Sequence, residues 1–530
     1  MQPILGRIDL AVTSTATGAP VSPAERPAPR PGRKRLGPQL AAAAVSGGVV
    51  AVAFPPYGLW FLAPLGVAAL VLLCAGQRPR RAALIGAVHG LATFLPMLSW
   101  MTVIGPDAWV LLALLEAAFV AMMAAGLPLV WRLPGRAWWA ACLWVAQEAA
   151  RDRLPFGGFP WGRLAFAETA SPFTPFAAVG GAPLVTWATA ISAGFLALAV
   201  HRRGHGSAVS RLAAALVAAV AVPVVGLLLP LSTSTDREVT VALVQGGVPG
   251  VGMDFAGERE QVLRNHVEAT RRLAADVRAG RSPAPNLVVW PENASDIDPF
   301  TDDRARRLID DAVRDVGVPV LVGAVVDGPG PRYVRNTGVV WDPLTGPGER
   351  YVKRHPVPFG EYIPFRAQLS GWIERLDQIP RDFFAGDRAG NLRLGPAEVG
   401  DVICFEVAYD GLVRDVVVGG AEVLVVQTNN ATYNGTGQPQ QQLAMSRLRA
   451  VEHGRAVLVA ATSGISAVIA PDGTVEQQAP ERAVRTLVAQ VPLRDATTVA
   501  TRLGATPEWL LVGAALVALG LGRRRKDVLP

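Results

Sequence analysis

Two hydrophobic patterns divide the chain near residue 231. Before that point long apolar runs follow one another, each near the ~20 residues that a helix needs to cross a bilayer. The expected runs are 39–56, 59–76, 82–104, 107–131, 137–150, 176–200 and 210–230. An eighth run extends from Trp509 to Leu521. The pattern predicts a membrane domain of about eight transmembrane helices, with a polar segment inserted before the last one.

The polar segment alternates between short strands and amphipathic helices. Strands are expected at 239–245, 286–290, 318–325, 334–341, 349–353, 422–427 and 456–461, in the residues just before Cys404, and on either side of the turn Pro471-Asp472-Gly473. Helices are expected at 258–278, 302–316, 412–418 and 438–453. This alternation is typical of α/β layering with largely buried sheets.

The ends of the chain carry no such pattern. Residues 1–37 are rich in Pro, Ala, Thr and Arg and predict a disordered basic cytoplasmic tail. The first apolar run begins near Gln39 without a clear cleavage site, so no cleavable signal peptide is expected. The predicted domains are the tail 1–37, a transmembrane domain 38–231, an α/β domain 232–505, an eighth span 506–523 and a basic cytoplasmic tail 524–530.

The basic residues set the predicted orientation. The net charge of +7 suggests nucleic-acid binding, but many Arg residues stand in short links between apolar runs. With eight spans these links share one side of the membrane, and the positive-inside rule makes that side cytoplasmic. Both termini are then cytoplasmic, and 231–505 lies on the outer face. The residues that fix this side are Arg26, Arg30, Arg33, Lys34, Arg35, Arg78, Arg80, Arg81, Arg132, Arg136, Arg202, Arg203, Arg211, Arg523, Arg524, Arg525 and Lys526.

One stretch breaks the charge rule. Arg151, Arg153 and Arg163 fall on the outer side, in a sequence interrupted by Gly, Pro and aromatic residues. Two interpretations remain open: an interfacial or re-entrant segment in which Trp161 and Arg163 meet lipid headgroups, or a simple tight loop.

Ionisable residues inside the apolar runs also need an explanation. His89 and Glu116 lie at a depth where such groups often mark a functional site. Hydrogen bonding between helices is the interpretation that we favour for both. Cys74 and Cys142, which lie in the same kind of run, are expected to be small core residues.

Cys404 is the only cysteine of the polar segment, and it follows a short apolar strand. A buried structural cysteine is the common case, but a lone thiol at a strand end is also a candidate nucleophile. Glu292 and Lys353 likewise stand at or just after strand ends. In open α/β sheets the carboxyl ends of strands line the ligand crevice, so the three residues are expected to meet there. A carboxylate can take the thiol proton, and an ammonium can stabilise an oxyanion.

A long irregular stretch runs from His355 to Gly390 and holds Phe359, Tyr362, Phe365, Trp372, Phe383 and Phe384. Loops of this length in compact domains are usually lids or binding loops. The alternative is a satellite hydrophobic cluster under the loop, and the sequence leaves both open.

Several short motifs of the sequence resemble those of a known family. The order Trp290-Pro291-Glu292, Lys353, Cys404-Phe405-Glu406 resembles the Glu-Lys-Cys order of the nitrilase, or carbon–nitrogen hydrolase, superfamily. Eight spans with that domain before the last one resemble the apolipoprotein N-acyltransferase family. Further matching words are Val244-Gln245-Gly246, Pro358-Phe359-Gly360-Glu361-Tyr362-Ile363-Pro364, Thr428-Asn429-Asn430 and Arg447-Leu448-Arg449-Ala450-Val451-Glu452. The chain departs from many members at Met253-Asp254-Phe255 and Thr432-Tyr433, where they carry Trp or Trp-Phe.

The resemblance implies an extracytoplasmic α-β-β-α sandwich and a ping-pong acyl transfer. Glu292 would be the general base, Cys404 the nucleophile that holds the acyl group as a thioester, and Lys353 the oxyanion stabiliser. A membrane phospholipid would be the acyl donor, and the N-terminal amine of a diacylated apolipoprotein the acceptor.

Further residues are assigned by the same resemblance. Glu361 and Glu406 would be supporting carboxylates, the alternative being ordinary surface charge. The substrate-binding candidates are Phe359, Tyr362, Asn429 and Tyr433.

No cofactor, metal or nucleic-acid partner is expected, because His residues are few and scattered and the sequence has no phosphate-loop motif. Two other functions remain open. One is a membrane-tethered amidase or nitrilase that uses the same three residues. The other is a non-catalytic lipid-binding protein or a transporter.

Overall fold

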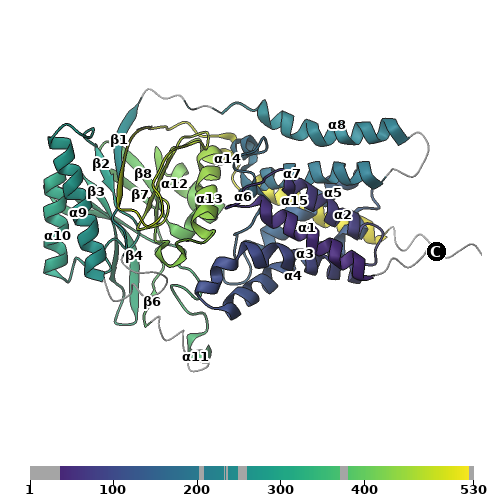
Figure 1. Cartoon of the computed structure of the whole chain (residues 1–530), viewed down its shortest axis with the longest axis horizontal. Helices are drawn as coiled ribbons and strands as arrows, with labels where there is room; N and C mark the ends of the chain where they lie inside the picture. The colour runs from purple at the N-terminus through teal and green to yellow at the C-terminus, as the bar shows by residue number, and fades with distance from the viewer. Residues whose placement is uncertain are drawn as a thin grey trace, which may run out of the picture.

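The computed structural model describes residues 36–201, 208–231, 233, 237–248, 259–369 and 380–524. The predicted tails before residue 36 and after residue 524, the links with Arg202 and Arg203, Met253-Asp254-Phe255 and Trp372 lie outside the described residues. Figure 1 shows an α/β part on the left and a helical half on the right.

Within the described residues, eight helices occupy the positions of the eight expected apolar runs. They are α1 (Leu36–Ala53), α2 (Leu62–Cys74), α3 (Pro79–Met97), α4 (Pro106–Val130), α5 (Arg136–Arg151), α7 (Ala177–His201), α8 (Ala208–Leu227) and α15 (Thr506–Arg524). Short helices η1 (Ser99–Val103), α6 (Leu164–Ala167) and η2 (Thr174–Phe176) stand between them. In the part of the chain that the structure describes, three helices are long and apolar enough to cross a membrane by length and composition: Leu36–Ala53, Pro106–Val130 and Thr174–His201.

The α/β part contains, among its described residues, two mixed sheets. One has the order β13-β1-β2-β3-β4-β5, with β6 beside β4, and the other has the order β12-β11-β10-β9-β8-β7. The strands of the first are β1 (Glu238–Gln245), β2 (Leu287–Val289), β3 (Val320–Asp327), β4 (Tyr333–Asp342), β5 (Gly346–Val352), β6 (Asp382–Phe383) and β13 (Arg485–Pro492). Those of the second are β7 (Asn391–Leu394), β8 (Ala397–Ile403), β9 (Val423–Thr428), β10 (Val457–Ala461), β11 (Ala467–Ile469) and β12 (Val475–Gln478).

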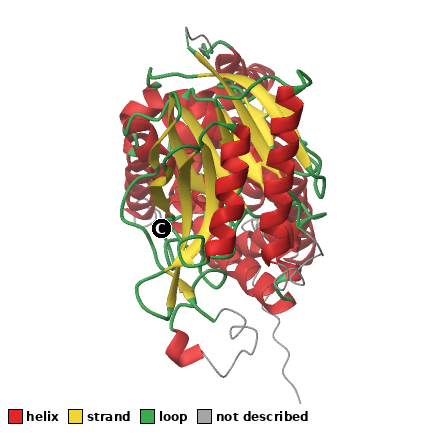
Figure 2. Ribbon diagram, turned by 90° about the vertical axis from the view of Figure 1, so that its left-hand side faces the viewer, coloured by secondary structure: helices red, strands yellow, loops and turns green. Residues whose placement is uncertain are grey.

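Helices cover both outer faces, and the result is the α-β-β-α layering implied by the resemblance. One apolar cluster lies between the sheets and joins residues such as Leu243 and Val425. A second lies under α9 (Arg259–Arg278) and α10 (Asp303–Val316), which stand in front of the sheets in Figure 2. The other face is covered by α12 (Asp410–Val418) and α13 (Gln438–His453). The remaining short helices are α11 (Arg366–Leu369), η5 (Cys404–Ala408), η6 (Ala431–Tyr433) and α14 (Val499–Leu503).

The layer of α12 and α13 joins the two halves of the molecule. Val416 on α12 and Leu448 on α13 belong to the same apolar cluster as Phe94, Trp144 and other residues of the helical half. In Figure 1 both helices lie between the sheets and the bundle. The α/β part therefore packs on the bundle through a shared apolar core.

The ionisable residues of the bundle are engaged in contacts between helices, as we favoured. The ring Nδ1 of His89 lies 2.8 Å from the hydroxyl of Ser46 on α1. Arg151 on α5 donates a hydrogen bond of 2.8 Å to Glu116 on α4. Cys74 and Cys142 are buried, as expected for core residues.

Candidate active site

Three strand ends bring the candidate catalytic residues to one edge of the two facing sheets. Glu292 follows β2, Lys353 follows β5 and Cys404 follows β8. Because β2 and β8 belong to different sheets, the site forms where the two sheets meet. The positions of these residues at strand ends predict this convergence, and the contacts below give its geometry.

Glu292 is buried, and both oxygens of its carboxylate accept hydrogen bonds. Oε1 accepts from Nζ of Lys353 at 3.1 Å and from the side-chain amide of Asn336 at 2.6 Å. Oε2 accepts from the backbone N–H of Asn429 at 2.7 Å. These donors fix the orientation of the carboxylate. A general base needs such a fixed orientation to reach the proton that it removes.

Lys353 lies between two carboxylates. Its Nζ donates to Oε1 of Glu361 at 2.9 Å as well as to Glu292, and Asn336 also donates to Glu361 at 3.0 Å. Burial lowers the pKa of Lys353, but the charges of Glu292 and Glu361 outweigh that effect and hold this pKa well above its ordinary value. The side chain therefore remains an ammonium at neutral pH, as stabilisation of an oxyanion requires. Since Lys353 shares both carboxylates, they form an ion-pair cluster rather than an open cation site.

Cys404 stands at a sharp turn between β8 and η5. Its φ of 54° lies in the left-handed region, which non-glycine residues adopt at a cost of roughly 1–2 kcal/mol. Burial, followed by the charge of Glu292, raises the pKa of the thiol to about 12, whereas Lys353 and Thr428 oppose that rise. The thiol is therefore protonated at neutral pH, and a base must accept its proton during nucleophilic attack.

Glu406 connects the turn of Cys404 to the segment that follows Lys353. Its buried carboxylate accepts hydrogen bonds from the backbone N–H groups of Ile403 (2.7 Å), Arg354 (2.7 Å) and His355 (3.0 Å). The hydroxyl of Tyr351 adds a bond of 2.9 Å. A single carboxylate thus holds the chain beside Cys404 and beside Lys353, so ordinary surface charge does not describe Glu406. Glu361, which pairs with Lys353, is equally engaged.

The substrate-binding candidates differ in their surroundings. Phe359 is exposed at the surface and lies edge to face against Phe156. Tyr362 is half-buried, and its backbone oxygen accepts from the N–H of Phe359. The side-chain oxygen of Asn429 accepts from Thr462. Tyr433 lies edge to face against Trp100 of the helical half.

The segment between α5 and α6 docks onto the turn of Cys404. Phe159 and Trp161 stack on the ring of Phe405, with centroids 5.8 and 6.2 Å apart. The hydroxyl of Tyr409 donates to the backbone oxygen of Gly158 at 2.9 Å. The turn that carries Cys404 therefore faces the helical half.

The same docking corrects one of the two predictions for this segment. Trp161 and Arg163 are 3 % and 2 % exposed, so they do not meet lipid headgroups. Arg163 instead pairs with Asp410 at 2.9 Å and with Asp152 at 3.3 Å. The physical reason is that acidic partners within the protein compensate the charge that we expected lipid to compensate.

Sequence reasoning missed several residues of the site. Asn336 bridges Glu292 and Glu361, and the hydroxyl of Thr428 lies 3.2 Å from the sulfur of Cys404. Thr428 belongs to the motif Thr428-Asn429-Asn430 that matches the family. Its position at the end of β9 could also have marked it as a site residue. Asn336 lies in the middle of β4, where nothing in the local pattern marks it.

The architecture and the site match a known class of domain. The family profile described as "Carbon-nitrogen hydrolase" matches residues 240–501, and the profile described as "Apolipoprotein N-acyltransferase N-terminal domain" matches residues 46–195. A protein of Mycolicibacterium smegmatis named apolipoprotein N-acyltransferase is 40 % identical over 90 % of this chain and 84 % of its own length. A namesake in Chromobacterium violaceum is 31 % identical over 97 % and 99 %. The chain belongs to the apolipoprotein N-acyltransferase family.

Among solved structures, a mutant of the Nesterenkonia AN1 amidase from the nitrilase superfamily covers 51 % of this chain and 95 % of its own. It is 19 % identical in sequence, with a TM-score of 0.37. Family membership and the apolar helices make this chain a membrane protein.

Proposed function

We propose that this acyltransferase moves an acyl chain from a membrane phospholipid to the N-terminal amine of the diacylglyceryl-cysteine of an apolipoprotein. The observation that carries the proposal is the position of Cys404. The charges of Glu292, Lys353 and Glu361 act on its thiol, and the next residue, Phe405, stacks on Phe159 and Trp161 of the helical half. Because Cys404 lies where the α/β part packs on the membrane domain, its thiol is placed to react with substrates that carry lipid chains.

The first half-reaction forms the thioester. Glu292 takes the proton of the Cys404 thiol as the sulfur attacks the ester carbonyl of the phospholipid. The negative charge that develops on the carbonyl oxygen is stabilised by the ammonium of Lys353. The C–O bond then breaks, Glu292 returns its proton to the departing alkoxide, and a lysophospholipid leaves.

The second half-reaction forms the amide. The free amine of the lipoprotein attacks the thioester carbonyl, again with Lys353 beside the oxyanion. As the C–S bond breaks, the sulfur regains a proton and the amine loses one, so the enzyme returns to its starting state. Glu361 and Glu406 keep Lys353 and the turn of Cys404 in place through both steps.

The orientation in the membrane belongs to the same proposal. Eight helices cross the bilayer, both termini lie in the cytoplasm, and the α/β domain stands on the outer face, where lipoproteins receive their acyl chains. The basic links between spans support this orientation.

Intact-mass spectrometry of the purified protein tests the chemistry. The full chain is incubated with vesicles of dipalmitoyl phosphatidylethanolamine, and then with a synthetic diacylated lipopeptide that has a free amine. We expect a gain of one palmitoyl group on Cys404, which disappears when the lipopeptide is added and gains that group. The variant Cys404→Ala should gain nothing. Absence of the adduct together with release of ammonia from simple amides would favour a hydrolase instead.

A further inference from the structure

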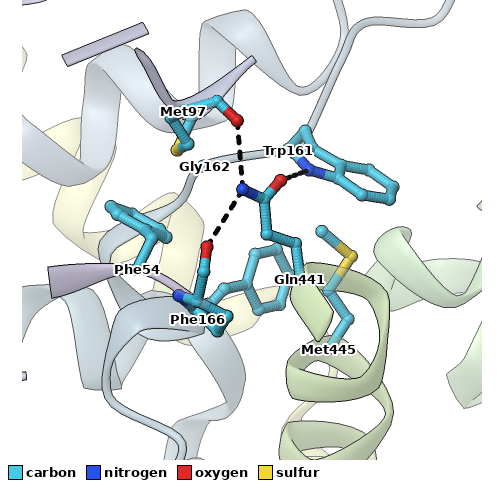
Figure 3. A pocket seen from close by; sticks show the side chains of 8 residues that line it. Phe54, Met97, Trp161, Gly162, Phe166, Gln441 and Met445 are labelled. Atoms are coloured by element: carbon cyan, nitrogen blue, oxygen red, sulfur yellow. Dashed lines mark hydrogen bonds between the residues drawn. The ribbon is translucent and has the colours of Figure 1, made fainter. Parts of the chain in front are cut away.

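The side-chain amide of Gln441 links the α/β part to the helical half. Gln441 lies in the first turns of α13 and is 4 % exposed. Its oxygen accepts hydrogen bonds from the indole N–H groups of Trp100 (3.0 Å) and Trp161 (2.7 Å). Its nitrogen donates to the backbone oxygens of Pro55 (3.1 Å) and Met97 (3.0 Å). Figure 3 shows the amide between Trp161 and Met97.

These four bonds use the whole hydrogen-bonding capacity of a glutamine side chain, which has two acceptor sites and two donors. The partners come from three separate places in the helical half: the residues after α1, the region from the end of α3 into η1, and the segment between α5 and α6. A leucine at position 441 would leave two indole N–H groups and two carbonyl oxygens without a partner. Buried polar groups in that state cost free energy, so the environment specifically favours an amide.

The two indoles connect Gln441 to the candidate active site. Trp161 stacks on Phe405, the residue after Cys404, and Trp100 lies edge to face against Tyr433 with centroids 5.2 Å apart. A shift of Trp161 would change the aromatic surface that the helical half places beside Cys404, whereas the hydrogen bond from the N–H of Ile403 to Glu406 still holds the turn of Cys404 itself. Gln441 is therefore bonded to the residue through which the helical half contacts that turn.

We propose that Gln441 is a positioning residue that aligns the helical half with the turn of Cys404, so that a lipid acyl donor arriving through the helical half reaches the sulfur. The inference rests on the proposed function, because it assumes a lipid donor and an acyl-enzyme. An alignment role predicts different effects on two acyl donors, whereas a role in stability alone predicts the same effect on both. A phospholipid depends on the alignment, whereas a small water-soluble ester reaches Cys404 without it.

The experiment compares Gln441→Leu with Gln440→Leu in the full chain, in mixed detergent and phospholipid micelles. Gln440 is a matched control, because it lies on the same helix but its amide donates to Glu481 of the α/β part. The rate of acyl-adduct formation on Cys404 is measured with dipalmitoyl phosphatidylethanolamine and with p-nitrophenyl acetate. For Gln441→Leu we expect a loss of about 10- to 100-fold with the phospholipid, the scale of a small misplacement of reacting groups. The rate with p-nitrophenyl acetate should stay at the parental value, and Gln440→Leu should match the parent with both donors.

Other outcomes would overturn the inference in recognisable ways. An equal loss with both donors, or loss of the folded protein, would make Gln441 a residue of general stability. An unchanged phospholipid rate would remove any role in alignment. A parental protein that forms no adduct with either donor would overturn the proposed function, and the inference with it.

A second variant gives an independent readout. In Gln441→Glu the ionised carboxylate accepts from both indoles but presents negative charge to two carbonyl oxygens. The protonated acid regains one donor, so the phospholipid rate of this variant relative to the parent should rise as the pH is lowered from about 8 to about 5. A pH-independent ratio would contradict the assigned bonds.

A double-mutant comparison tests the path through Trp161. Trp161→Phe removes the same indole N–H, so adding it to Gln441→Leu should slow phospholipid transfer little beyond Gln441→Leu alone. If the losses in the phospholipid rate were fully additive, the two residues would act separately, and Gln441 would not act through Trp161.

Discussion

The hydroxyl of Thr428 lies 3.2 Å from the sulfur of Cys404 and is positioned to donate a hydrogen bond to it. This contact lowers the pKa of the thiol, although burial and the charge of Glu292 together raise it. A donor to sulfur stabilises it most when the sulfur carries negative charge, as the proposed mechanism requires during attack and during breakdown of the thioester.

The variant Thr428→Val should therefore slow formation of the thioester by about tenfold, the value of one hydrogen bond to a charged group. The thiol pKa rises further when the donor is lost, so less of the developing thiolate is stabilised. Intact-mass measurement of the acyl adduct over time gives the rate. Thr428→Ser keeps the hydroxyl and should remain close to the parent, whereas equal rates for the Val and Ser variants would rule out a role for this bond.

Alkylation of the free enzyme should follow the raised pKa of Cys404. Because that pKa is about 12, the thiolate fraction is small at neutral pH and grows with each rise in pH. The rate of iodoacetamide modification of Cys404 should increase about tenfold per pH unit between pH 7 and pH 10, without a plateau. Mass spectrometry of the modified peptide gives this profile. A plateau near pH 8 would mean that Cys404 behaves as an ordinary or activated thiol.

Removal of the charge on Glu406 should damage both the fold and the chemistry. In Glu406→Gln one carboxylate oxygen becomes an NH₂ group that faces backbone donors, and the segment after Lys353 loses its anchor. We expect a loss of about 2 kcal/mol in unfolding free energy, the cost of mismatched buried hydrogen bonds. Denaturant unfolding in detergent measures this change. Glu398→Gln, which removes the carboxylate of a solvent-exposed pair with Arg393, should leave the unfolding free energy close to that of the parent.

Asp410 should be important for the junction between the two halves. It pairs with Arg163 of the helical half and with Arg449 of α13, at 2.9 and 2.7 Å. Burial alone would raise the pKa of Asp410, but the two guanidinium groups outweigh it and lower this pKa. Asp410→Asn leaves two buried cations less well compensated and should cost about 3 kcal/mol in thermal or denaturant unfolding.

The sign of the pH effect follows from the lowered pKa. The stability that Asp410 contributes is fully present above the pKa of a free aspartate, about 4, and is lost as the pH falls towards the lower folded value. The difference between parent and Asp410→Asn should therefore shrink on acidification below pH 4. Asp415→Asn, which removes the more exposed partner of Arg354, is the matched control. A constant difference at all pH values would contradict the pairing.

The orientation in the membrane can be tested with single cysteines in a background that carries Cys74→Ala, Cys142→Ala and Cys404→Ala. Leu344 is 93 % exposed in the turn between β4 and β5, and Arg78 is exposed between α2 and α3. We expect a membrane-impermeant maleimide to label Leu344→Cys on intact spheroplasts and Arg78→Cys only after lysis. The reverse pattern would invert the proposed topology.

Most secondary structure followed from local patterns. The periodicity around residues 438–453 predicted α13 with its bounds, and the run before Cys404 is the strand β8. Strand β13 was missed, although its buried positions Leu487, Ala489 and Val491 alternate with more exposed ones as in a half-buried strand. A search for period-two alternation after the turn at residue 473 would have found it.

The contacts between the two halves were not predictable in the same way. Nothing in the local pattern distinguishes Gln441 from Gln440, yet the first joins four groups of the helical half and the second bonds to Glu481. Such roles depend on residues that are distant in sequence, which periodicity does not encode. For the same reason the docking of Trp161 on Phe405 could not be foreseen.

The apolar layer formed by α12 and α13 has a consequence for handling the protein. Val416, Leu448 and their neighbours share a core with the helical half, so cutting the chain after α8 would expose this layer to water. Large bare apolar surfaces drive aggregation. An excised α/β fragment should precipitate on expression unless detergent or redesigned polar side chains cover this apolar layer. The intact chain is therefore the smallest practical unit for biochemistry.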